Sequence, residues 1–280
     1  MIIVGLGKAG CNIANAFSKY PQYKTYGIDT TKDADITIKK KKSHEEYDSQ
    51  FPSLTRKLKF DNKDVFVIIG GGGEISGGTL RLLEQIKKNR VTVIYLQPDL
   101  ALGSETQKQQ ERIVRNVLQE YARSGAIEAI WLISNHMVEK GIGEAPILGY
   151  YDVLNQAIVN TVHMINVFKN SEPVIGNFIT PSQLSRIATI GVVDMEEEKE
   201  KWFYELTNPR DVVYYYGINE EQLKEDGTLF RKITNYVKSQ LANGVNVSYG
   251  VFQTTYDQKY CYCIKYSSMV QSFLDDQEIS

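Results

Sequence analysis

The strongest indication of the fold of this chain is its opening segment, Ile2-Ile3-Val4-Gly5-Leu6-Gly7-Lys8-Ala9-Gly10. An apolar run rich in Ile and Val leads into glycines at the spacing Gly-x-Gly-x-x-Gly, and a helix is predicted over about Cys11–Lys19. The glycines allow a tight turn and a close approach to a ligand, and the start of a helix presents free N–H groups to a phosphate. The spacing alone is weak evidence, but its position between a strand and a helix predicts a phosphate-binding loop.

Further apolar runs alternate with helical segments along the first half of the chain. The predicted strands are Met1–Val4, Thr25–Ile28, Asp64–Ile69, Val91–Leu96 and Ala129–Ile133. Besides the first helix, we predict helices at about Thr79–Asn89 and Glu105–Ser124, the latter with an apolar face of Ile113, Val117 and Tyr121. This alternation predicts an α/β fold with a doubly wound, mainly parallel sheet, in which ligands bind at the carboxyl ends of the strands.

A second glycine-rich loop, Gly70-Gly71-Gly72-Gly73-Glu74-Ile75-Ser76-Gly77-Gly78, follows the third predicted strand. So many glycines carry a high conformational entropy, which a plain connector does not need. Ser76 and Thr79 add hydroxyl donors. A flexible connector is the alternative interpretation. Two such loops at the ends of neighbouring strands indicate one phosphate chain held from two sides.

A third loop, Asp29-Thr30-Thr31, follows the second predicted strand. An acidic residue about 20 residues after a glycine loop is also the ribose-binding signature of dinucleotide-binding domains. An NAD-dependent oxidoreductase is therefore a competing hypothesis. Against it, such an enzyme has no standard use for the second glycine loop, and no proton-transfer residue stands out in the C-terminal half.

The second half of the chain has a different character. A long helix is predicted from about Tyr150 to Phe168, with a broad apolar face. A smaller α+β region follows, with a helix inside Glu220–Leu241 that carries Leu229, Ile233, Tyr236, Val237 and Leu241 on one face. Its predicted strands are Ile187–Val193, Val212–Tyr216, Val245–Thr254 and Tyr260–Tyr266, with Tyr256–Lys259 turning a hairpin between the last two. We expect a nucleotide-binding domain at 1–149, a connecting helix at 150–170 and a smaller domain at 171–280.

Composition narrows the class of function. A formal net charge of −2 gives no general reason to expect nucleic-acid or membrane binding, and no apolar run is long enough to span a membrane. The chain opens directly into a strand, so we expect no signal peptide. The cysteines are too few for a disulfide framework and the histidines are scattered, so we expect no metal centre and a reduced, cytoplasmic protein. These residues are Cys11, Cys261, Cys263, His44, His136 and His163.

Several of these motifs, in this order, resemble the tubulin/FtsZ family over about the first 180 residues. Gly7-Lys8-Ala9-Gly10-Cys11-Asn12 is similar to the family's first phosphate loop, Gly27–Thr31 to its Asn-Thr-Asp loop, and Gly70–Gly78 to its glycine-rich signature. Pro98–Gly103 stands in the place of the sugar-binding loop. Ile133-Ser134-Asn135 resembles a strand that ends in a base-contacting asparagine, and Tyr151-Asp152-Val153-Leu154 the start of the central helix.

The resemblance implies a GTP- or GDP-binding cytoskeletal protein that assembles head to tail into filaments. It suggests a compact, divergent member, of the kind found in phages and plasmids. The implied nucleotide-binding residues are Gly7, Lys8, Ala9, Gly10, Asn12, Asp29, Thr30, Thr31, Gly71, Gly72, Gly73, Glu74, Ser76, Gly77, Gly78, Glu105, Asn135, Tyr151 and Asp152.

Three departures from the family pattern concern the site. Glu74 places a carboxylate where the family has glycine near the phosphates, which repels the ligand unless a Mg²⁺ ion lies between them. Leu102 replaces a glutamate of the sugar loop, although Glu105 is close by. Tyr151 replaces the usual asparagine or aspartate of the central helix, with Asp152 beside it.

The largest departure follows the central helix. The family has Asn-x-Asp-x-x-Asp there, and its carboxylates orient the attacking water on the neighbouring subunit's nucleotide. Here the segment reads Asn177-Phe178-Ile179-Thr180-Pro181-Ser182, and nothing in the spacing favours Glu172 or Asp194 as a substitute. We therefore expect weak or lost hydrolysis. A tubulin-fold interaction protein that no longer binds nucleotide is the first alternative, and the NAD-dependent oxidoreductase the second.

Overall fold

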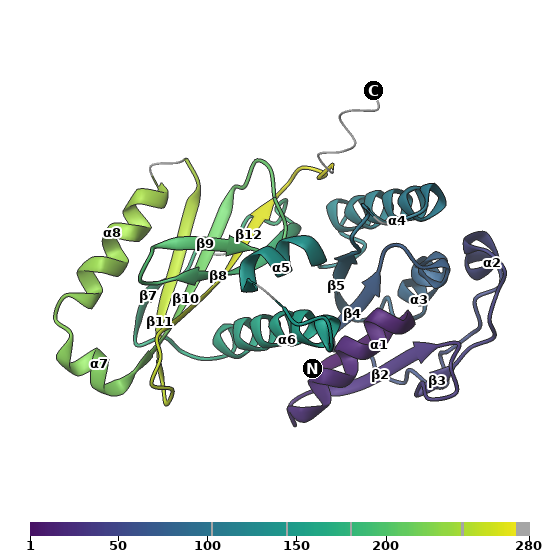
Figure 1. The fold of residues 1–280 in the computed structure, drawn as a ribbon, viewed down its shortest axis with the longest axis horizontal. Helices are drawn as coiled ribbons and strands as arrows, with labels where there is room; N and C mark the ends of the chain where they lie inside the picture. Colours follow the sequence, from purple (N-terminus) through teal and green to yellow (C-terminus); the bar gives the residue numbers. More distant parts are fainter. Residues whose placement is uncertain (102, 144, 180, 242–243, 273–280) are drawn as a thin grey trace.

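The structure, a computed structural model, describes residues 1–101, 103–143, 145–179, 181–241 and 244–272. Its centre is one continuous sheet in the order β3-β2-β1-β4-β5-β6-β8-β12-β10-β11-β7, with β9 paired to β8 (Figure 1). The first six strands of this order are parallel throughout. The predicted doubly wound, mainly parallel α/β sheet is confirmed. These strands are β1 (Ile2–Leu6), β2 (Lys24–Asp29), β3 (Ile36–Thr37), β4 (Asp64–Gly70), β5 (Arg90–Gln97) and β6 (Ala129–Ser134).

Helices cover both faces of the parallel part of the sheet, because the strands are apolar on both sides. Two separate hydrophobic cores result, one on each face. One face carries α1 (Gly7–Ala16), α5 (Asn135–Ile142) and α6 (Tyr150–Lys169). The other carries α2 (His44–Ser49), α3 (Thr79–Gln85) and α4 (Glu105–Arg123).

The sheet continues into the second half through a short join. Only Ile130↔Ile187 and Trp131↔Ala188 pair β6 with β8. Beyond it, α6 lies on one face, and α7 (Glu220–Glu225) and α8 (Leu229–Leu241) cover a third core on the other. The strands of this half are β7 (Ile175–Asn177), β8 (Ile187–Asp194), β9 (Lys199–Trp202), β10 (Asp211–Asn219), β11 (Asn246–Thr254) and β12 (Tyr260–Ser267). Among the described residues, no helix combines the length and hydrophobicity that crossing a membrane requires.

The predicted hairpin between the last two strands is wrong. β10 lies between β11 and β12, parallel to the first and antiparallel to the second. The turn at 255–259 therefore crosses over one strand instead of joining neighbours. The predicted helix in Glu220–Leu241 is present as two helices, and Leu241 is 48% exposed, because α8 ends there and its last turn extends past the core.

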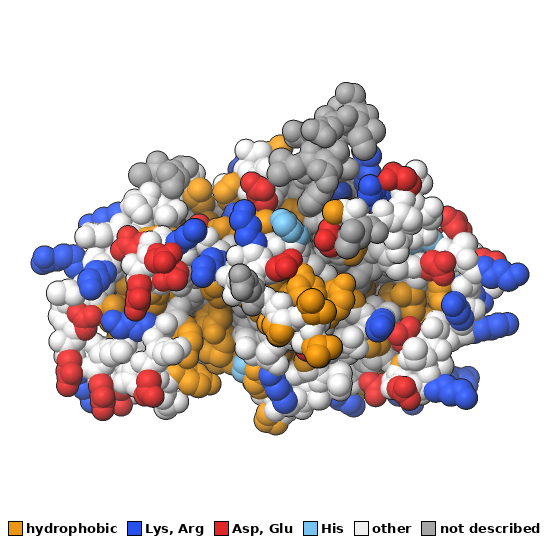
Figure 2. Space-filling model, viewed as in Figure 1, with side chains coloured by type: hydrophobic (Ala, Val, Ile, Leu, Met, Phe, Trp, Pro, Cys, Tyr) orange, Lys and Arg blue, Asp and Glu red, His pale blue; other side chains and the backbone are white. Residues whose placement is uncertain are grey.

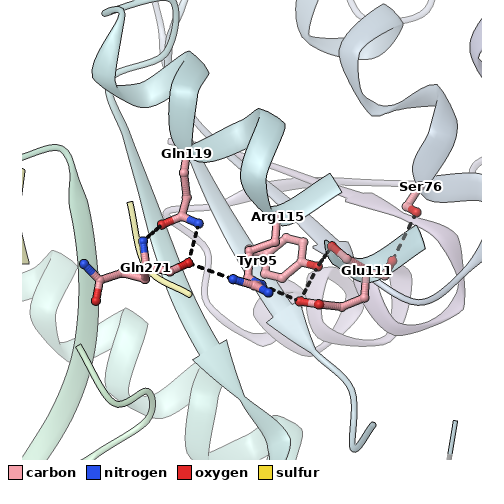
Figure 3. Close-up of polar contacts among 7 residues, drawn as sticks. Ser76, Tyr95, Glu111, Arg115, Gln119 and Gln271 are labelled. Carbon is pink, nitrogen blue, oxygen red and sulfur yellow. Dashed lines mark hydrogen bonds and ion pairs between the residues drawn. The ribbon is translucent and has the colours of Figure 1, made fainter. Parts of the chain in front are cut away.

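The predicted apolar face of α4 is also wrong. Ile113 is 57% exposed and Tyr121 36% exposed. The buried face instead carries Val114, Leu118 and Ala122 together with three polar residues, Glu111, Arg115 and Gln119. Those polar groups can be buried because each has a partner inside the protein, as Figure 3 shows.

Candidate nucleotide-binding site

The carboxyl ends of the parallel strands open on a cleft of about 570 Å³. This volume lies within the range of about 300–1,000 Å³ that small-molecule sites occupy. Hollows of about 720 and 950 Å³ lie elsewhere on the surface, but neither is lined by a glycine-rich loop. The lining residues are Leu6, Gly7, Lys8, Ala9, Asn12, Gly70, Gly71, Gly72, Gly73, Ile75, Leu96, Pro98, Asp99, Leu100, Gly103, Gln107, Asn135, Tyr151 and Asn155.

The first loop turns from β1 directly into α1. Gly7 has φ of +72°, a left-handed conformation that favours glycine. A Cβ at Gly10 would lie 2.3 Å from the carbonyl oxygen of Ile68, so only glycine lets α1 pack this closely on β4. The N-cap residue Leu6 provides no side-chain acceptor for the first turn of α1. The N-terminus of α1 therefore presents N–H groups and a partial positive charge to the cleft, beside the exposed Lys8.

The second loop has two parts with different surroundings. Gly70 to Gly73 line the cleft. Gly77 and Gly78 are buried instead, where added Cβ atoms would lie 2.1 Å from the carbonyl oxygen of His44 and 2.2 Å from the ring of Phe51. Packing requires these two glycines and also Gly71, where an added Cβ would lie 1.8 Å from the Tyr95 hydroxyl. The other glycines at the front of the loop bring the backbone close to the cleft.

Four of the side chains that line the cleft are suited to a base. Asn12 comes from α1, Asn135 from the start of α5, and Tyr151 and Asn155 from the first turns of α6. The three helices share a core, which fixes their positions relative to one another. Asparagine amides can pair with the edges of a base, and an exposed tyrosine ring can stack on its face.

The predicted site residues divide into two groups. Those that line the cleft are Gly7, Lys8, Ala9, Asn12, Gly71, Gly72, Gly73, Asn135 and Tyr151. Those that do not are Gly10, Asp29, Thr30, Thr31, Glu74, Ser76, Gly77, Gly78, Glu105 and Asp152. Leu102 lies outside the described residues. Asn155 was missed, although it stands one helical turn after Tyr151, and that spacing places both on one side of α6.

Ile75, also missed, projects into the cleft where the sequence drew attention to Glu74. Glu74 is exposed and does not line the cleft. Ile75 does, and its Cγ2 would lie 2.6 Å from a Cβ placed on Gly7. The two loops therefore meet through this side chain, and the carboxylate of Glu74 does not border the space for a ligand.

Asp29 and Cys11 have structural partners at the base of the first loop. Asp29 is 9% exposed, and its Oδ1 accepts the N–H of Thr30 at 2.7 Å. The Cys11 thiol donates to the carbonyl oxygens of Gly5 and Ile28. Burial, with a smaller contribution from the charge of Asp29, raises the pKa of Cys11 to about 12, so it remains a thiol.

The segment after α6 reaches the far edge of the sheet. Asn177 ends β7 and is exposed, while the N–H of Ile179 donates to Ser248 Oγ at 2.9 Å. Asp194 is remote from it, because Val193 and Ile175 lie in one row of the sheet, four strands and roughly 19 Å apart. Asp194 also accepts the N–H groups of Glu196 and Glu197, which lowers the pKa of its carboxyl.

No three His, Cys, Asp or Glu side chains gather into a potential metal site in the part of the chain that the structure describes. A nucleotide fits the observed groups better than a dedicated metal centre does. The cleft combines a helix N-terminus, Lys8 and bare glycine backbone with side-chain amides and an aromatic ring.

Structural relatives share this architecture. No protein-family model matches the sequence, and no curated protein sequence matches it significantly. Among solved structures, a GDP-form protofilament of TubZ from Bacillus thuringiensis serovar israelensis has a TM-score of 0.73 at 16% identity, covering 96% of this chain and 87% of that one.

An FtsZ dimer from M. jannaschii has a TM-score of 0.70 at 14% identity, covering 95% of this chain and 87% of that one. A GTPγS-bound protofilament of CetZ2 from Haloferax volcanii also has a TM-score of 0.70 at 14% identity, covering 95% of this chain and 93% of that one. At these identities the matches establish the fold alone. The chain therefore has the tubulin/FtsZ-like fold that its motifs predicted.

Proposed function

We propose that this chain binds GTP or GDP in the cleft and assembles head to tail into cytoplasmic filaments, with weak or lost hydrolysis. The observation that carries the proposal is a cleft bordered by two glycine-rich loops, at one end of a central helix whose other end leads to an exposed apolar segment. We also propose that the chain is divided into a nucleotide-binding domain at 1–149, a connecting helix at 150–170 and a smaller domain at 171–280.

The chemistry of the cleft supports a nucleotide. Lys8, the start of α1 and the Gly70–Gly73 backbone supply positive charge and N–H donors for phosphates. Asn12, Asn135 and Asn155 supply amides for the base, with the Tyr151 ring beside it. Glu74 does not line the cleft but Asp99 does, so a Mg²⁺ ion would be held by the phosphates, by water and by the Asp99 carboxylate.

Two exposed apolar surfaces at opposite ends of α6 support self-association. Ile147 and Leu148, 94% and 91% exposed, lie just before α6, close in sequence to the cleft residue Tyr151. Figure 2 shows exposed hydrophobic side chains gathered where α5 leads into α6. Val174, Ile175, Phe178 and Ile179 are exposed beyond the other end, roughly 30 Å away along the helix.

Two different surfaces at opposite ends of a subunit pair heterologously, and such contacts generate open filaments. Self-association is also seen in proteins of similar structure, since one solved TubZ structure is a two-stranded filament and one of CetZ2 is a protofilament. In such an assembly Ile179 of one subunit would face the nucleotide of the next. No carboxylate stands at that position, which is why we expect slow turnover.

Nucleotide identification on freshly purified protein tests the proposal. Denaturation should release a guanine nucleotide, and light scattering should rise on addition of GTP, with filaments visible by electron microscopy. Release of no nucleotide, together with no affinity for added GTP, would refute it.

The variant Ile179→Asp tests the interface separately. It should raise GTP hydrolysis roughly tenfold, because a carboxylate there can orient water on the neighbour's nucleotide. Leu184→Asp is the matched control, since Leu184 is also an exposed apolar residue, 72% exposed, outside the Asn177–Ser182 segment. Equal rates in both variants would contradict the head-to-tail geometry.

A second function is favoured by Ile75. Its side chain covers Gly7 and so reduces the space at the first loop. The cleft would then hold a smaller ligand, or the protein would have kept the fold and lost the nucleotide. Such a protein would release no nucleotide but would still self-associate. The NAD-dependent alternative loses its supporting observation, since Asp29 is buried and does not line the cleft.

A further inference from the structure

Tyr95 packs against the second glycine loop at Gly71. It lies on β5, fully buried, and a Cβ placed on Gly71 would be only 1.8 Å from its hydroxyl oxygen. The hydroxyl is therefore in direct contact with the backbone of Gly71. On the other side, Ser76 Oγ donates to the carbonyl oxygen of Gly73 at 2.6 Å. The front of the loop is held between these two hydroxyls.

The Tyr95 hydroxyl is itself fixed by charged partners on α4. It donates to Glu111 Oε1 at 3.0 Å, and the same oxygen accepts from Arg115 Nε at 2.9 Å (Figure 3). Glu111 and Arg115 are each 1% exposed. Burial and the neighbouring carboxylate raise the pKa of Tyr95, so the hydroxyl keeps its proton and remains a donor.

The other end of this chain of contacts is a segment distant in sequence. Arg115 Nη1 donates to the carbonyl oxygen of Gln271 at 2.7 Å. Gln119 pairs with the same backbone in both directions, donating to that carbonyl at 3.0 Å and accepting its N–H at 2.7 Å. The Gln271 side chain is fixed in turn by Thr207 and Met269. Segment 268–272 is thus docked on α4 by buried hydrogen bonds between the side chains of Arg115 and Gln119 and the backbone of Gln271.

We propose that Tyr95, Glu111 and Arg115 are positioning residues for the Gly70–Gly73 loop. Docking of segment 268–272 holds Arg115, and through it Glu111 and Tyr95, in the arrangement that supports the loop. This inference rests on the proposed function, because it assumes that the loop binds phosphates. The loop's N–H groups can point at a phosphate only while the Gly71 peptide keeps its place. A change at Gln271 reaches that peptide through three side chains in contact with one another.

The coupling is reciprocal. If docking of segment 268–272 favours the phosphate-binding shape of the loop, then a bound phosphate chain must strengthen the docking by the same factor. Nucleotide binding should therefore slow hydrogen exchange at the N–H of Gln271, although that residue does not line the cleft.

The first test compares Tyr95→Phe and Gln119→Met with controls that make the same chemical change elsewhere. Tyr216→Phe removes a buried hydroxyl from the core of the second half, and Gln109→Met changes an exposed glutamine of α4. Competition against a fluorescent guanine nucleotide should show GDP affinity reduced roughly tenfold in Tyr95→Phe and severalfold in Gln119→Met. Both controls should bind as the parent does.

Guanosine separates positioning from general damage. It lacks phosphates, so its affinity should be unchanged in Tyr95→Phe if the hydroxyl acts only through the phosphate loop. An equal loss for guanosine and GDP, or no loss for either, would overturn the proposal.

Hydrogen exchange measured without nucleotide separates the positioning of the loop from the proposed nucleotide binding. The N–H of Gly71 bonds to Leu96 and that of Ser76 to Gly73. Both should exchange faster in Tyr95→Phe and Gln119→Met than in the controls. If the parent protein binds no nucleotide, the proposed function fails, but faster exchange still supports the positioning; unchanged exchange in both variants overturns it.

Discussion

The two glycine-rich loops use their glycines against different neighbours. In the first loop, Gly5 and Gly10 let the backbone of α1 approach the backbones of β1 and β4. In the second, Gly77 also meets backbone, at His44, but Gly71 and Gly78 accommodate the side chains of Tyr95 and Phe51. Backbone contacts within one strand–helix unit leave little freedom, whereas side-chain contacts can change when their own partners move. The first loop is therefore a fixed element of the fold, whereas the front of the second loop, at Gly71, can be adjusted through the partners of Tyr95.

The largest expected effect comes from breaking the charged support of the second loop. Arg115→Met leaves Glu111 buried without its cation, and should lower the free energy of unfolding by about 3–5 kcal/mol. Arg123→Met on the same helix breaks an exposed pair with Glu120 and should cost about 0–1 kcal/mol. Urea unfolding of the two variants measures both. Equal losses would mean that the buried network is no more than a surface pair in strength.

A smaller loss of stability is expected from a substitution that tests the rigidity of the first loop. Gly10→Ala forces a Cβ against the Ile68 carbonyl, and overpacking of this kind should destabilise by about 1–3 kcal/mol. Gly73→Ala is the matched change in the second loop. Its Cβ would meet only Ile75, at 3.9 Å, and the φ of Gly73 is −94°, so the effect should stay within about 0.5 kcal/mol. Thermal unfolding would reveal the difference, and its absence would show that α1 can move away from β4.

Ile75 contacts both loops, so truncating its side chain tests whether that contact limits nucleotide binding. Ile75→Ala should raise nucleotide affinity roughly fivefold, since a half-buried side chain no longer needs to move from above Gly7, a saving of about 1 kcal/mol. Titration with a fluorescent guanine nucleotide gives the affinity. A lower affinity would instead mean that Ile75 is part of the binding surface.

The smallest expected effect is on pH dependence. His163 on α6 stacks on Tyr20 and hydrogen-bonds to Tyr23, in the connection between α1 and β2, and His44 contacts Gly77 of the second loop. Burial lowers the pKa of both below the ordinary 6.5. The unfolded chain then binds more protons, so stability is complete above that value and falls as the pH drops through the folded-state pKa.

Urea unfolding at about pH 7.5 and about pH 5 measures this loss. His163→Gln and His44→Gln should each reduce it, with the exposed His136→Gln as the control. A pH dependence that is the same in all three variants would exclude both histidines as its source.

The sequence predicted the elements whose signals are local. The strands of the first half were visible as short Val- and Ile-rich runs, and the glycine loops as the breaks between strand and helix. The same signals placed Gly7 and Gly70–Gly73 at one edge of the sheet, because parallel strands end together.

Features set by distant partners could not be predicted. The pattern of α4 suggested that Ile113 and Tyr121 were buried, but the protein buries Glu111, Arg115 and Gln119, whose partners are separated from them by up to 156 residues. Likewise, the turn after β11 looks like a hairpin, and nothing local indicates that β10 inserts between its strands. At the cleft, the sequence drew attention to Glu74 because of its charge, while the orientation of the turn presents Ile75.

The hydrogen bonds between α4 and Gln271 also constrain the order of events during synthesis. Gln271 emerges from the ribosome 156 residues after Arg115. Until then the guanidinium and the Gln119 amide, both buried in the finished protein, lack that backbone partner. The first half can form its strands and helices as it emerges, but α4 completes its buried hydrogen bonds only after most of the second half has been made.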